Sequence, residues 1–377
     1  MKKLLIITKT LALDDGLGRY SMGLIERLKK VYKLIILSSE LADADRNYLE
    51  KDGVECHKIA PVKHFFNLPY SFLYSWKLLK FFRTADFIHS FSDYPQCLLP
   101  FWLPFFKKRP IFITVHGTYG VAPLNDFKSG FFLKRAYKKS KKIFCVSSFT
   151  EKEILKRLKL DNTLIINNGV EYEKFVSKER LTKRTNAKEK IILGVGILKH
   201  RKGYHISIPV VGEVKKKYPD IKYYIVGNQS DRNYFDKLKD LVKKHDLEGN
   251  VIFLGKISEK ELIDLYYSAD LFLLTPVNIE DNFEGFGLVF LEASACATPV
   301  IGTRGCGAED AIEDGRTGFL VPQEDVKKTA EAILKLLDNP ELAKKMGENA
   351  RKKAGQMTWD NMSKKYIEAY ENIISER

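Results

Sequence analysis

Residues Leu271–Ile301 have the sequence LFLLTPVNIEDNFEGFGLVFLEASACATPVI, which contains a strand, a loop, a helix and a second strand. Leu271–Leu274 is a short apolar run typical of a buried strand, and Thr275–Phe283 is a loop. Phe286–Ala297 has the length of a helix, and Pro299–Ile301 begins the next apolar run. This order predicts a parallel sheet covered by helices.

The same alternation of strands and helices extends along the whole chain. In the first half we expect strands at Leu4–Thr8, Leu34–Leu37, Phe87–His89, Ile111–Val115, Ile143–Val146 and Thr163–Ile166. Helical periodicity in that half covers Tyr20–Lys30, Tyr74–Phe82 and Thr150–Leu158. Further strands are expected at Ile191–Val195, Lys222–Val226, Val251–Leu254 and Gly318–Val321. Helices are expected at Gly203–Lys217, Asn233–Lys244, Glu259–Ser268, Glu324–Leu337, Pro340–Lys353 and Trp359–Ile374.

The chain length and a polar segment predict two domains. A chain of 377 residues exceeds one ordinary core. The segment Val176–Lys190 is almost wholly polar and is typical of a linker. We therefore predict two doubly wound, Rossmann-like α/β domains over residues 1–177 and 188–358, facing across a ligand cleft at the carboxyl ends of their strands.

The composition is that of a globular protein, with 45% hydrophobic and 29% charged residues. It excludes disordered and fibrous classes. Five cysteines are scattered without a Cys-x-x-Cys pair, which argues against a zinc site or a disulfide framework. This cysteine pattern fits reduced thiols, which are typical of a cytoplasmic protein. The apolar runs are too short for a signal peptide or a membrane span.

Two glutamates and two glycines around residue 288 indicate a binding site. Gly285 and Gly287 flank the expected helix start, where unpaired backbone N–H groups and the helix dipole favour a diphosphate. Glu292 is expected inside the helix among apolar neighbours, where a buried carboxylate needs a partner, and a ribose diol is one candidate. Glu284 precedes the helix and is placed to contact the other end of the same ligand.

The pair Glu284 and Glu292, followed by Thr298-Pro299-Val300-Ile301, resembles the donor site of the family-four retaining glycosyltransferases of GT-B fold. Further motifs occur in the order expected for that family over nearly the whole chain. These are Gly16-Leu17-Gly18, Asp86-Phe87-Ile88-His89, Thr114-Val115-His116-Gly117, Asn168-Gly169-Val170, Lys202-Gly203, Val226-Gly227, Phe253-Leu254-Gly255 and Gly315-Arg316-Thr317-Gly318. The last helix, over residues 359–377, resembles the one that crosses back to the first domain in the family.

The resemblance implies roles for residues of the second half. Glu292 would bind the ribose and Glu284 the hydroxyls of the donor sugar. The backbone at Gly285, Phe286, Gly287 and Leu288, together with the side chain of Lys202, would hold the diphosphate. Gly227 belongs to the same expected donor site. Ile257 would contact the base through its backbone.

It also implies roles for residues of the first half. Gly16 and Gly18 would let a glycine-rich loop approach the phosphate closely, because no side chain obstructs it. His116 would hydrogen-bond the donor sugar near its anomeric carbon. We interpret His89 as structural, because its motif is incomplete. The family's usual reaction is front-face substitution, in which the departing phosphate takes the acceptor's proton. We see no Asp-x-Asp metal motif near an expected strand end, so we expect cationic side chains and helix N–H groups to replace a metal, with no other cofactor.

One position departs from the family pattern. Ile197, in Gly196-Ile197-Leu198, stands where the family usually has an arginine that helps to bind the diphosphate. Our hypothesis is that Arg201, next to Lys202, supplies this charge from a different position. If no other cation substitutes, the chain would be an inactive homologue.

Two other classes of function remain open on the sequence alone. Gly16-x-Gly18-x-x-Ser21, with Glu40 after the next strand, nearly fits a dinucleotide fingerprint, so an NAD-dependent oxidoreductase is one alternative. Ser21 replaces the third glycine, and the glutamate pair would be left unexplained. A sugar-nucleotide epimerase or a non-catalytic sugar-nucleotide binder is the other alternative.

Positive charge is concentrated in the first half of the chain. Residues 1–175 hold 30 Lys and Arg against 17 Asp and Glu, whereas the remainder holds 33 against 31. The segment Lys134–Lys142 has six cations and no acid, and an aromatic-rich region from Phe65 to Phe106 precedes it. One hypothesis is peripheral contact with an anionic membrane at its inner face, and a glycan or lipid-linked acceptor. The alternative is an aromatic core with a solvated basic face. We expect no nucleic-acid partner, because no binding module is recognised.

Overall fold

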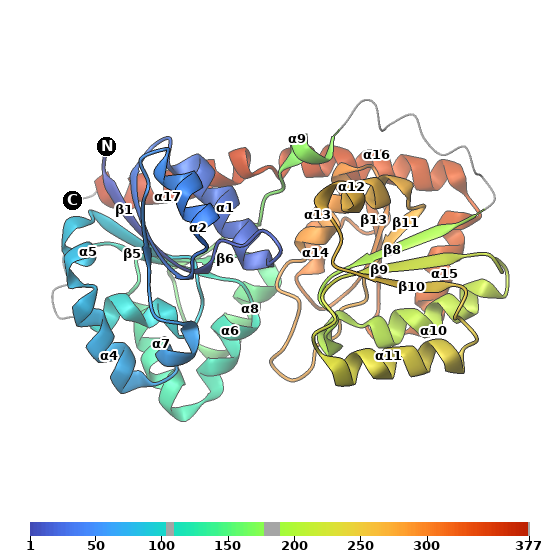
Figure 1. Ribbon diagram of the computed structural model, residues 1–377, viewed down its shortest axis with the longest axis horizontal. Helices are drawn as coiled ribbons and strands as arrows, with labels where there is room; N and C mark the ends of the chain where they lie inside the picture. The colour runs from blue at the N-terminus through green and yellow to red at the C-terminus, as the bar shows by residue number, and fades with distance from the viewer. Residues whose placement is uncertain (103–108, 177–188, 376–377) are drawn as a thin grey trace. The chain divides into compact units, whose positions relative to one another are not determined.

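The computed structural model describes residues 1–102, 109–176 and 189–375, which form two compact α/β units (Figure 1). The first unit comprises Met1–Gly169 together with Trp359–Arg377, and the second comprises Val170–Thr358.

The first unit is built on a parallel sheet of seven strands in the order β3-β2-β1-β4-β5-β6-β7. The strands are β1 (Lys3–Thr10), β2 (Lys33–Glu40), β3 (Glu55–Lys58), β4 (Phe87–Ser90), β5 (Ile111–Val115), β6 (Lys142–Cys145) and β7 (Thr163–Ile165). The helices are α1 (Gly16–Leu28), α2 (Asp43–Glu50), α3 (Val62–Phe65), α4 (Leu68–Lys77), α5 (Leu79–Thr84), η1 (Gln96–Trp102), α6 (Thr118–Val121), η3 (Ala122–Asn125), α7 (Phe127–Lys139) and α8 (Ser148–Arg157). The central strands are buried along most of their length, which explains why they are uniformly apolar.

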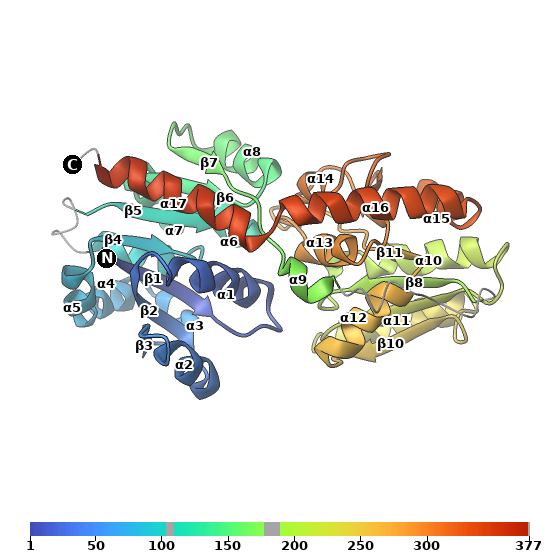
Figure 2. The ribbon, with the colours of Figure 1, turned by 90° about the horizontal axis from the view of Figure 1, so that it is seen from above.

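The last helix, α17 (Trp359–Ser375), belongs to the first unit and is drawn in red in Figure 2. It packs on α1, where a Cβ added at Gly23 would lie 2.4 Å from the Trp359 ring. The hydroxyl of Tyr20 donates to that of Tyr366 at 3.1 Å, and Lys2 pairs with Glu371 at 2.6 Å. The chain therefore returns to its first unit through specific side-chain contacts.

The second unit has six parallel strands in the order β10-β9-β8-β11-β12-β13. They are β8 (Ile191–Val195), β9 (Lys222–Val226), β10 (Val251–Gly255), β11 (Leu271–Leu273), β12 (Val300–Thr303) and β13 (Gly318–Val321). The helices are α9 (Tyr172–Phe175), η5 (His200–Lys202), α10 (Tyr204–Lys215), α11 (Arg232–Lys244), α12 (Glu259–Ser268), α13 (Leu288–Ala295), α14 (Ala308–Ala311), α15 (Val326–Leu337) and α16 (Pro340–Gln356). These strands follow the predicted ranges closely, and the predicted α/β class with two doubly wound sheets is confirmed.

The unit boundary differs from the expected end of the first domain at residue 177. Val170 donates its N–H to the Met357 carbonyl at 2.9 Å, and the Phe175 carbonyl accepts from the Tyr267 hydroxyl at 2.5 Å. These contacts place residues 170–175 in the second unit. The predicted linker falls mostly on residues 177–188, which lie outside the described residues.

Each sheet has one point where the order of its strands reverses along the chain. In the first unit it lies between β1 and β4, and in the second between β8 and β11. Loops that leave the two strands at such a point diverge, and ligands of open α/β sheets bind there, beyond the carboxyl ends of the strands. Residues of a ligand site are therefore expected in these loops.

Candidate active site

In the second unit, the loop after β8 packs closely on the loop after β11 and is hydrogen-bonded to it. Gly203 has a φ of +73°, and a Cβ on it would lie 1.7 Å from the Thr275 carbonyl oxygen. The Thr275 hydroxyl donates to the Gly203 carbonyl at 2.8 Å, and Val277 donates its N–H to the Arg201 carbonyl at 2.9 Å. Only glycine can adopt this positive φ while the Thr275 carbonyl lies so close, which explains why a glycine follows Lys202.

The loop after β8 places two cationic side chains in contact with one carboxylate. Arg201 Nη1 and Lys202 Nζ donate to Glu284 Oε2 at 2.7 and 2.6 Å. Burial alone would raise the pKa of the Glu284 carboxyl, but the charges and hydrogen bonds of Lys202 and Arg201 outweigh it and lower that pKa to about 2. Burial, with repulsion from Arg201, lowers the pKa of Lys202 despite its attraction to Glu284. The ionised cluster has one net positive charge at the strand-reversal point.

The helix after Glu284 begins later than predicted. The predicted helix started at Phe286, whereas α13 starts at Leu288, with Gly287 as its N-cap at a φ of +83°. The backbone ahead of it is tightly packed, because a Cβ on Gly307 would lie 2.0 Å from the Gly285 carbonyl oxygen. Within the described part of the chain, no backbone carbonyl accepts from the N–H groups of Phe286, Gly287 or Leu288. These groups are suited to an anion.

Glu292 lies in the second turn of α13 and is 4% exposed. Its Oε2 accepts from the hydroxyl of Tyr266, on α12, at 2.9 Å. The Thr298 hydroxyl in turn donates to the Tyr266 carbonyl at 2.6 Å. The protein thus partly satisfies this carboxylate itself. Sequence reasoning missed Tyr266, because an aromatic residue in an amphipathic helix has no signal that separates it from ordinary core.

The loops after β9 and β10 adjoin the loop after β8. A Cβ on Gly227 would lie 2.0 Å from the Gly196 carbonyl oxygen, and Gly227 donates its N–H to the Gly255 carbonyl at 2.9 Å. Gly227 is therefore needed for packing between loops. Ile257 is half-buried between β10 and Ser258, the N-cap of α12. The structure places both residues at the same edge of the sheet as Lys202.

In the first unit, the expected glycine-rich loop is a helix start, which corrects the prediction. Asp15 caps α1 by accepting from the Leu17 N–H at 2.7 Å, so Gly16 and Gly18 lie in the first turn. A Cβ on Gly18 would lie 1.9 Å from the Ala12 carbonyl oxygen. A Cβ on Gly16 would meet no described atom within 4 Å. Gly18 is thus required by internal packing, whereas Gly16 has open space beside it.

His116 follows β5 and lies beside a carboxyl that sequence reasoning missed. Its Nε2 donates to the Phe91 carbonyl at 2.7 Å, and its backbone N–H donates to Asp93 Oδ1 at 3.0 Å. Burial lowers the pKa of His116 to about 4, so the neutral ring has an unprotonated Nδ1 that can accept a hydrogen bond. Burial also raises the pKa of Asp93 to about 7, although the His116 N–H opposes it. Asp93 follows β4, at the carboxyl edge of the sheet, and this position was the one sequence signal that could have identified it.

His89 is part of a buried hydrogen-bond network, which is consistent with a structural role for this residue. Its Nδ1 contacts the Tyr370 hydroxyl at 2.5 Å, and its Nε2 contacts the Thr114 hydroxyl at 2.8 Å. The Tyr20 hydroxyl also contacts that of Thr114, at 2.8 Å. Burial lowers the pKa of His89 well below its usual value. The network connects α17 to the strands of the first unit.

Two family profiles match the chain in succession. Residues 15–174 match the profile described as Glycosyltransferase Family 4, and residues 176–353 match Glycosyl transferases group 1. The chain belongs to the family-four GT-B glycosyltransferases. This membership favours a glycosyltransferase over the NAD-dependent oxidoreductase that the glycine pattern left open.

Relatives of this glycosyltransferase match it over very different lengths. An uncharacterized glycosyltransferase of Methanocaldococcus jannaschii is 27% identical over 361 residues, which is 95% of each chain. A D-inositol 3-phosphate glycosyltransferase of Corynebacterium urealyticum is 30% identical over 220 residues, 55% of this chain and 51% of the relative. The crystal structure of Anabaena HepE in complex with UDP and glucose matches with a TM-score of 0.82 at 18% identity, over 99% and 100% of the two chains. That likeness shows the shared fold.

The described residues of the glycosyltransferase hold no group of three or more His, Cys, Asp or Glu side chains arranged for a metal ion. An Asp-x-Asp sequence, Asp43-Ala44-Asp45, does follow a strand, β2, which corrects the expectation that none lies near a strand end. It lies in the first turn of α2, where Asp43 pairs with Arg46 at 4.0 Å. Metal independence and the roles assigned to individual residues stay predictions. Over the same residues, no helix is long and apolar enough to cross a bilayer.

Proposed function

We propose that this glycosyltransferase moves a hexose from a nucleoside diphosphate donor to an acceptor hydroxyl, with retention at the anomeric carbon and without a metal. The observation that carries the proposal is the cluster of Arg201 with the buried Lys202 and Glu284, which has one net positive charge at the strand-reversal point. A diphosphate needs such a charge, and the start of α13 supplies N–H groups to it. The structure of HepE with UDP and glucose supports the choice of donor class.

In this proposal, each end of the donor is bound by a different part of the second unit. Arg201 and Lys202 hold the diphosphate with the backbone at Gly285–Leu288. Glu284 positions those cations and contacts the sugar hydroxyls. Glu292 binds the ribose while Tyr266 fixes its carboxylate, and the backbone near Ile257 and Gly227 adjoins the base.

The first unit contributes His116 and the start of α1. With Nε2 held by the Phe91 carbonyl, Nδ1 of His116 accepts a hydrogen bond from a hydroxyl of the donor sugar. The open space beside Gly16 leaves room for a ligand at the start of α1. The acceptor oxygen then bonds to the anomeric carbon on the face from which the diphosphate leaves. The acceptor's proton passes to a departing phosphate oxygen, so no side-chain nucleophile is needed.

We further propose a glycan or lipid-linked acceptor of cell-surface polysaccharide or glycolipid synthesis, reached at the cytoplasmic face of a membrane. The basic first half of the chain supports this, because anionic lipid surfaces attract clustered lysines and arginines.

The decisive experiment is a thermal-shift panel without metal, comparing UDP, GDP, ADP, dTDP, CDP and NAD. A ligand that binds only the folded state raises the melting temperature with its concentration. We expect one nucleoside diphosphate to stabilise the protein and NAD to have no effect. Stabilisation by NAD alone would overturn the proposal in favour of an oxidoreductase.

Turnover assays with the matching sugar nucleotide then test the reaction. We expect transfer to persist in excess EDTA and the product to retain the donor's anomeric configuration. Loss of all turnover in EDTA would disprove metal independence. Donor binding without any transfer or hydrolysis would identify a non-catalytic binder, and interconversion of the donor sugar would identify an epimerase.

A further inference from the structure

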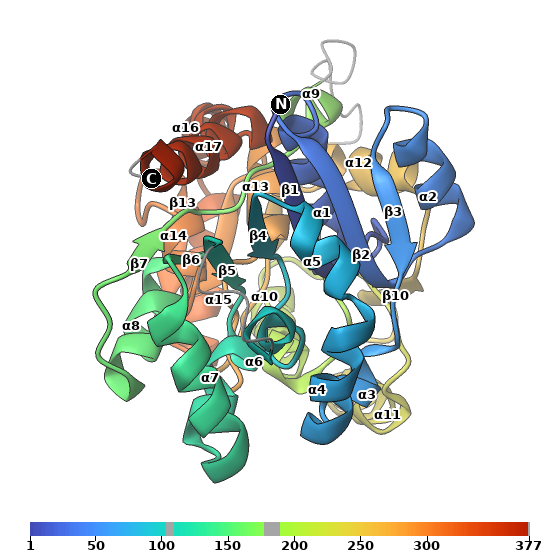
Figure 3. The same ribbon diagram turned by 90° about the vertical axis from the view of Figure 1, so that its left-hand side faces the viewer.

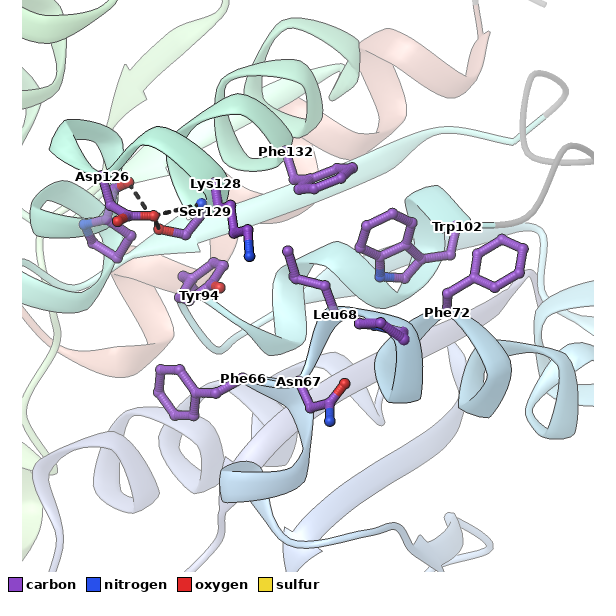
Figure 4. Close-up of a pocket in the computed structure, with 12 residues that line it drawn as sticks. Phe66, Asn67, Leu68, Phe72, Tyr94, Trp102, Asp126, Lys128, Ser129 and Phe132 are labelled. Carbon is purple, nitrogen blue, oxygen red and sulfur yellow. Dashed lines mark hydrogen bonds between the residues drawn. The ribbon is translucent and has the colours of Figure 1, made fainter.

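The first unit contains an apolar groove that the donor site does not use (Figure 4). It lies between α3 and α4 on one side and η1, η3 and α7 on the other. Its volume is about 870 Å³, within the range of about 300–1,000 Å³ typical of ligand sites. The lining residues are Phe66, Asn67, Leu68, Pro69, Phe72, Tyr94, Trp102, Pro123, Asp126, Lys128, Ser129 and Phe132.

Aromatic rings line the groove along its length, and hydrogen-bonding groups lie at one end. Trp102 packs edge-on against Phe72 and contacts Phe132, with ring centroids 6.1 and 4.8 Å apart. At the other end, Asp126 accepts from the backbone N–H and hydroxyl of Ser129, each at 2.7 Å (Figure 4). An aromatic groove with hydrogen-bonding groups at one end is suited to an amphiphile.

The two helices that line the groove, α4 and α7, also carry exposed large apolar side chains. On α7, Phe127 is 94% and Phe131 is 64% exposed, and they lie four residues apart on one face of the helix. On α4, Leu73 and Trp76 are also exposed. In Figures 1 and 3, α4 and α7 lie at the same end of the first unit. Large exposed apolar groups gathered in this way mark an interaction surface.

The charge of α7 identifies the kind of partner. The helix carries five cations and no acid: Lys128, Lys134, Arg135, Lys138 and Lys139. Bulky aromatics at one end of a basic helix are typical of helices that lie in the interface of an anionic bilayer.

We propose that this end of the first unit docks on an anionic membrane and that the groove takes the hydrocarbon chain of a lipid. Phe127 and Phe131 insert at the level of the headgroups, and the cations of α7 lie beside the lipid phosphates. The polar end, at Asp126 and Ser129, faces the headgroup. That a lipid-linked acceptor is presented in this way rests on the proposed function, whereas docking itself does not.

Flotation with vesicles tests the docking. We expect the protein to bind vesicles of phosphatidylglycerol and phosphatidylcholine at least about tenfold more than phosphatidylcholine alone, and 1 M salt to reduce binding. The double variant Phe127→Ser/Phe131→Ser should lose about tenfold in binding. The matched control, Leu155→Ser/Leu164→Ser, changes two other exposed apolar residues of the same unit and should bind like the wild type. Equal binding by both variants, or no binding to either vesicle, would overturn the proposal.

Tryptophan quenching tests the groove. The chain has three tryptophans, and Trp359 is buried. In a Trp76→Phe variant, lipids brominated along the acyl chain should quench the emission of Trp102. The quenching should disappear in Trp76→Phe/Trp102→Phe, which keeps only Trp359. Quenching that is absent in the first variant, or unchanged in the second, would show that no chain enters the groove.

The nucleotide panel separates this inference from the proposed function. Phe127 and Phe131 lie in the first unit, so the double variant should keep the wild-type shift with the nucleoside diphosphate. Loss of vesicle binding with that shift intact supports docking. A protein that floats with vesicles but responds to no nucleotide would refute the donor proposal alone.

Discussion

Arg201 shows how one side chain can compensate for a departure elsewhere in the sequence. Ile197 stands where the family usually has an arginine, yet Arg201 reaches Glu284 at 2.7 Å beside Lys202. We predict that Arg201→Ala raises the dissociation constant of the nucleoside diphosphate about 10- to 100-fold, because a charged hydrogen bond contributes about 1.5–3 kcal/mol. Isothermal titration measures this.

The exposed Lys199 provides the matched control for that measurement. Lys199→Ala removes a nearby positive charge that has no contact with Glu284 and should leave the dissociation constant within about twofold. Ile197→Arg, added to Arg201→Ala, should restore part of the affinity. An unchanged dissociation constant in Arg201→Ala would show that Lys202 and the backbone suffice.

The ionisation of Asp93 should affect the stability of the folded protein between about pH 4 and pH 7. Its pKa of about 7 in the folded protein lies above its ordinary value of 3.8, so the folded state binds more protons than the unfolded state between these values. Its contribution to stability therefore falls as the pH rises from about 4 to about 7. An asparagine side chain at this position would not ionise, and its amide oxygen could still accept from the His116 N–H.

We predict that Asp93→Asn raises the melting temperature relative to the wild type, and that the difference is larger at pH 8 than at pH 5. Thermal unfolding across this range measures it. Comparison with the wild type cancels the opposite trend from His116, whose lowered pKa makes its contribution fall as the pH decreases. The exposed Asp161, changed to asparagine, controls for the loss of one carboxylate from the surface. A constant difference for Asp93→Asn would contradict the raised pKa.

At the scale of the element, the two glycines at the start of α1 have different expected roles, Gly18 in folding and Gly16 in ligand binding. Gly18→Ala would place a Cβ 1.9 Å from the Ala12 carbonyl oxygen, a backbone atom, and we predict a loss of about 1–3 kcal/mol of stability. Gly16→Ala has open space and should stay within about 1 kcal/mol of the wild type. Denaturant unfolding measures both values.

Activity distinguishes the role of Gly16 from that of Gly18. If α1 approaches the diphosphate at Gly16, kcat/KM of Gly16→Ala falls although its stability is normal. Full activity in that variant would remove Gly16 from the donor site. Wild-type stability in Gly18→Ala would show that the turn before α1 can relax.

At the scale of the whole molecule, α17 makes the first unit depend on the end of the chain. Trp359, Tyr366 and Tyr370 are buried by Tyr20, Phe112 and Phe144. Removing one such side chain costs about 3–5 kcal/mol, so losing all three approaches the total stability of about 5–15 kcal/mol of a typical domain. We predict that a chain ending at Thr358 loses the cooperative unfolding of the first unit.

The remaining tryptophans report on this truncation, because Trp76 and Trp102 both lie in the first unit. Their emission should lose its thermal transition, whereas the nucleotide should still stabilise the second unit. Lys364→Ala/Lys365→Ala, which changes exposed positions of α17, should leave both transitions in place. A native tryptophan transition in the truncated chain would show that the first unit is complete without α17.

Local pattern determined the elements with strong apolar runs. The six strands of the second unit were predictable because each contains a short apolar run, as is typical of parallel strands covered by helices. Family motifs such as Glu284 and Glu292 could also be recognised from their order along the chain. By contrast, β3 (ECHK) lies at the edge of its sheet and was missed, because its alternating polar residues resemble a loop.

The sequence by itself therefore determined the fold class, the family and the segments that carry the candidate site. Only the tertiary structure decided that Gly18 serves packing while Gly16 is open, that Tyr266 holds Glu292, and that Arg201 joins Lys202 on Glu284. The contacts of Tyr266 with Glu292 and of Arg201 with Glu284 join residues 26 and 83 positions apart, and the Gly18 contact depends on how the turn before α1 folds. Strand and helix periodicity is a local property of the chain, whereas such contacts form only when the sheet brings loops together at its edge.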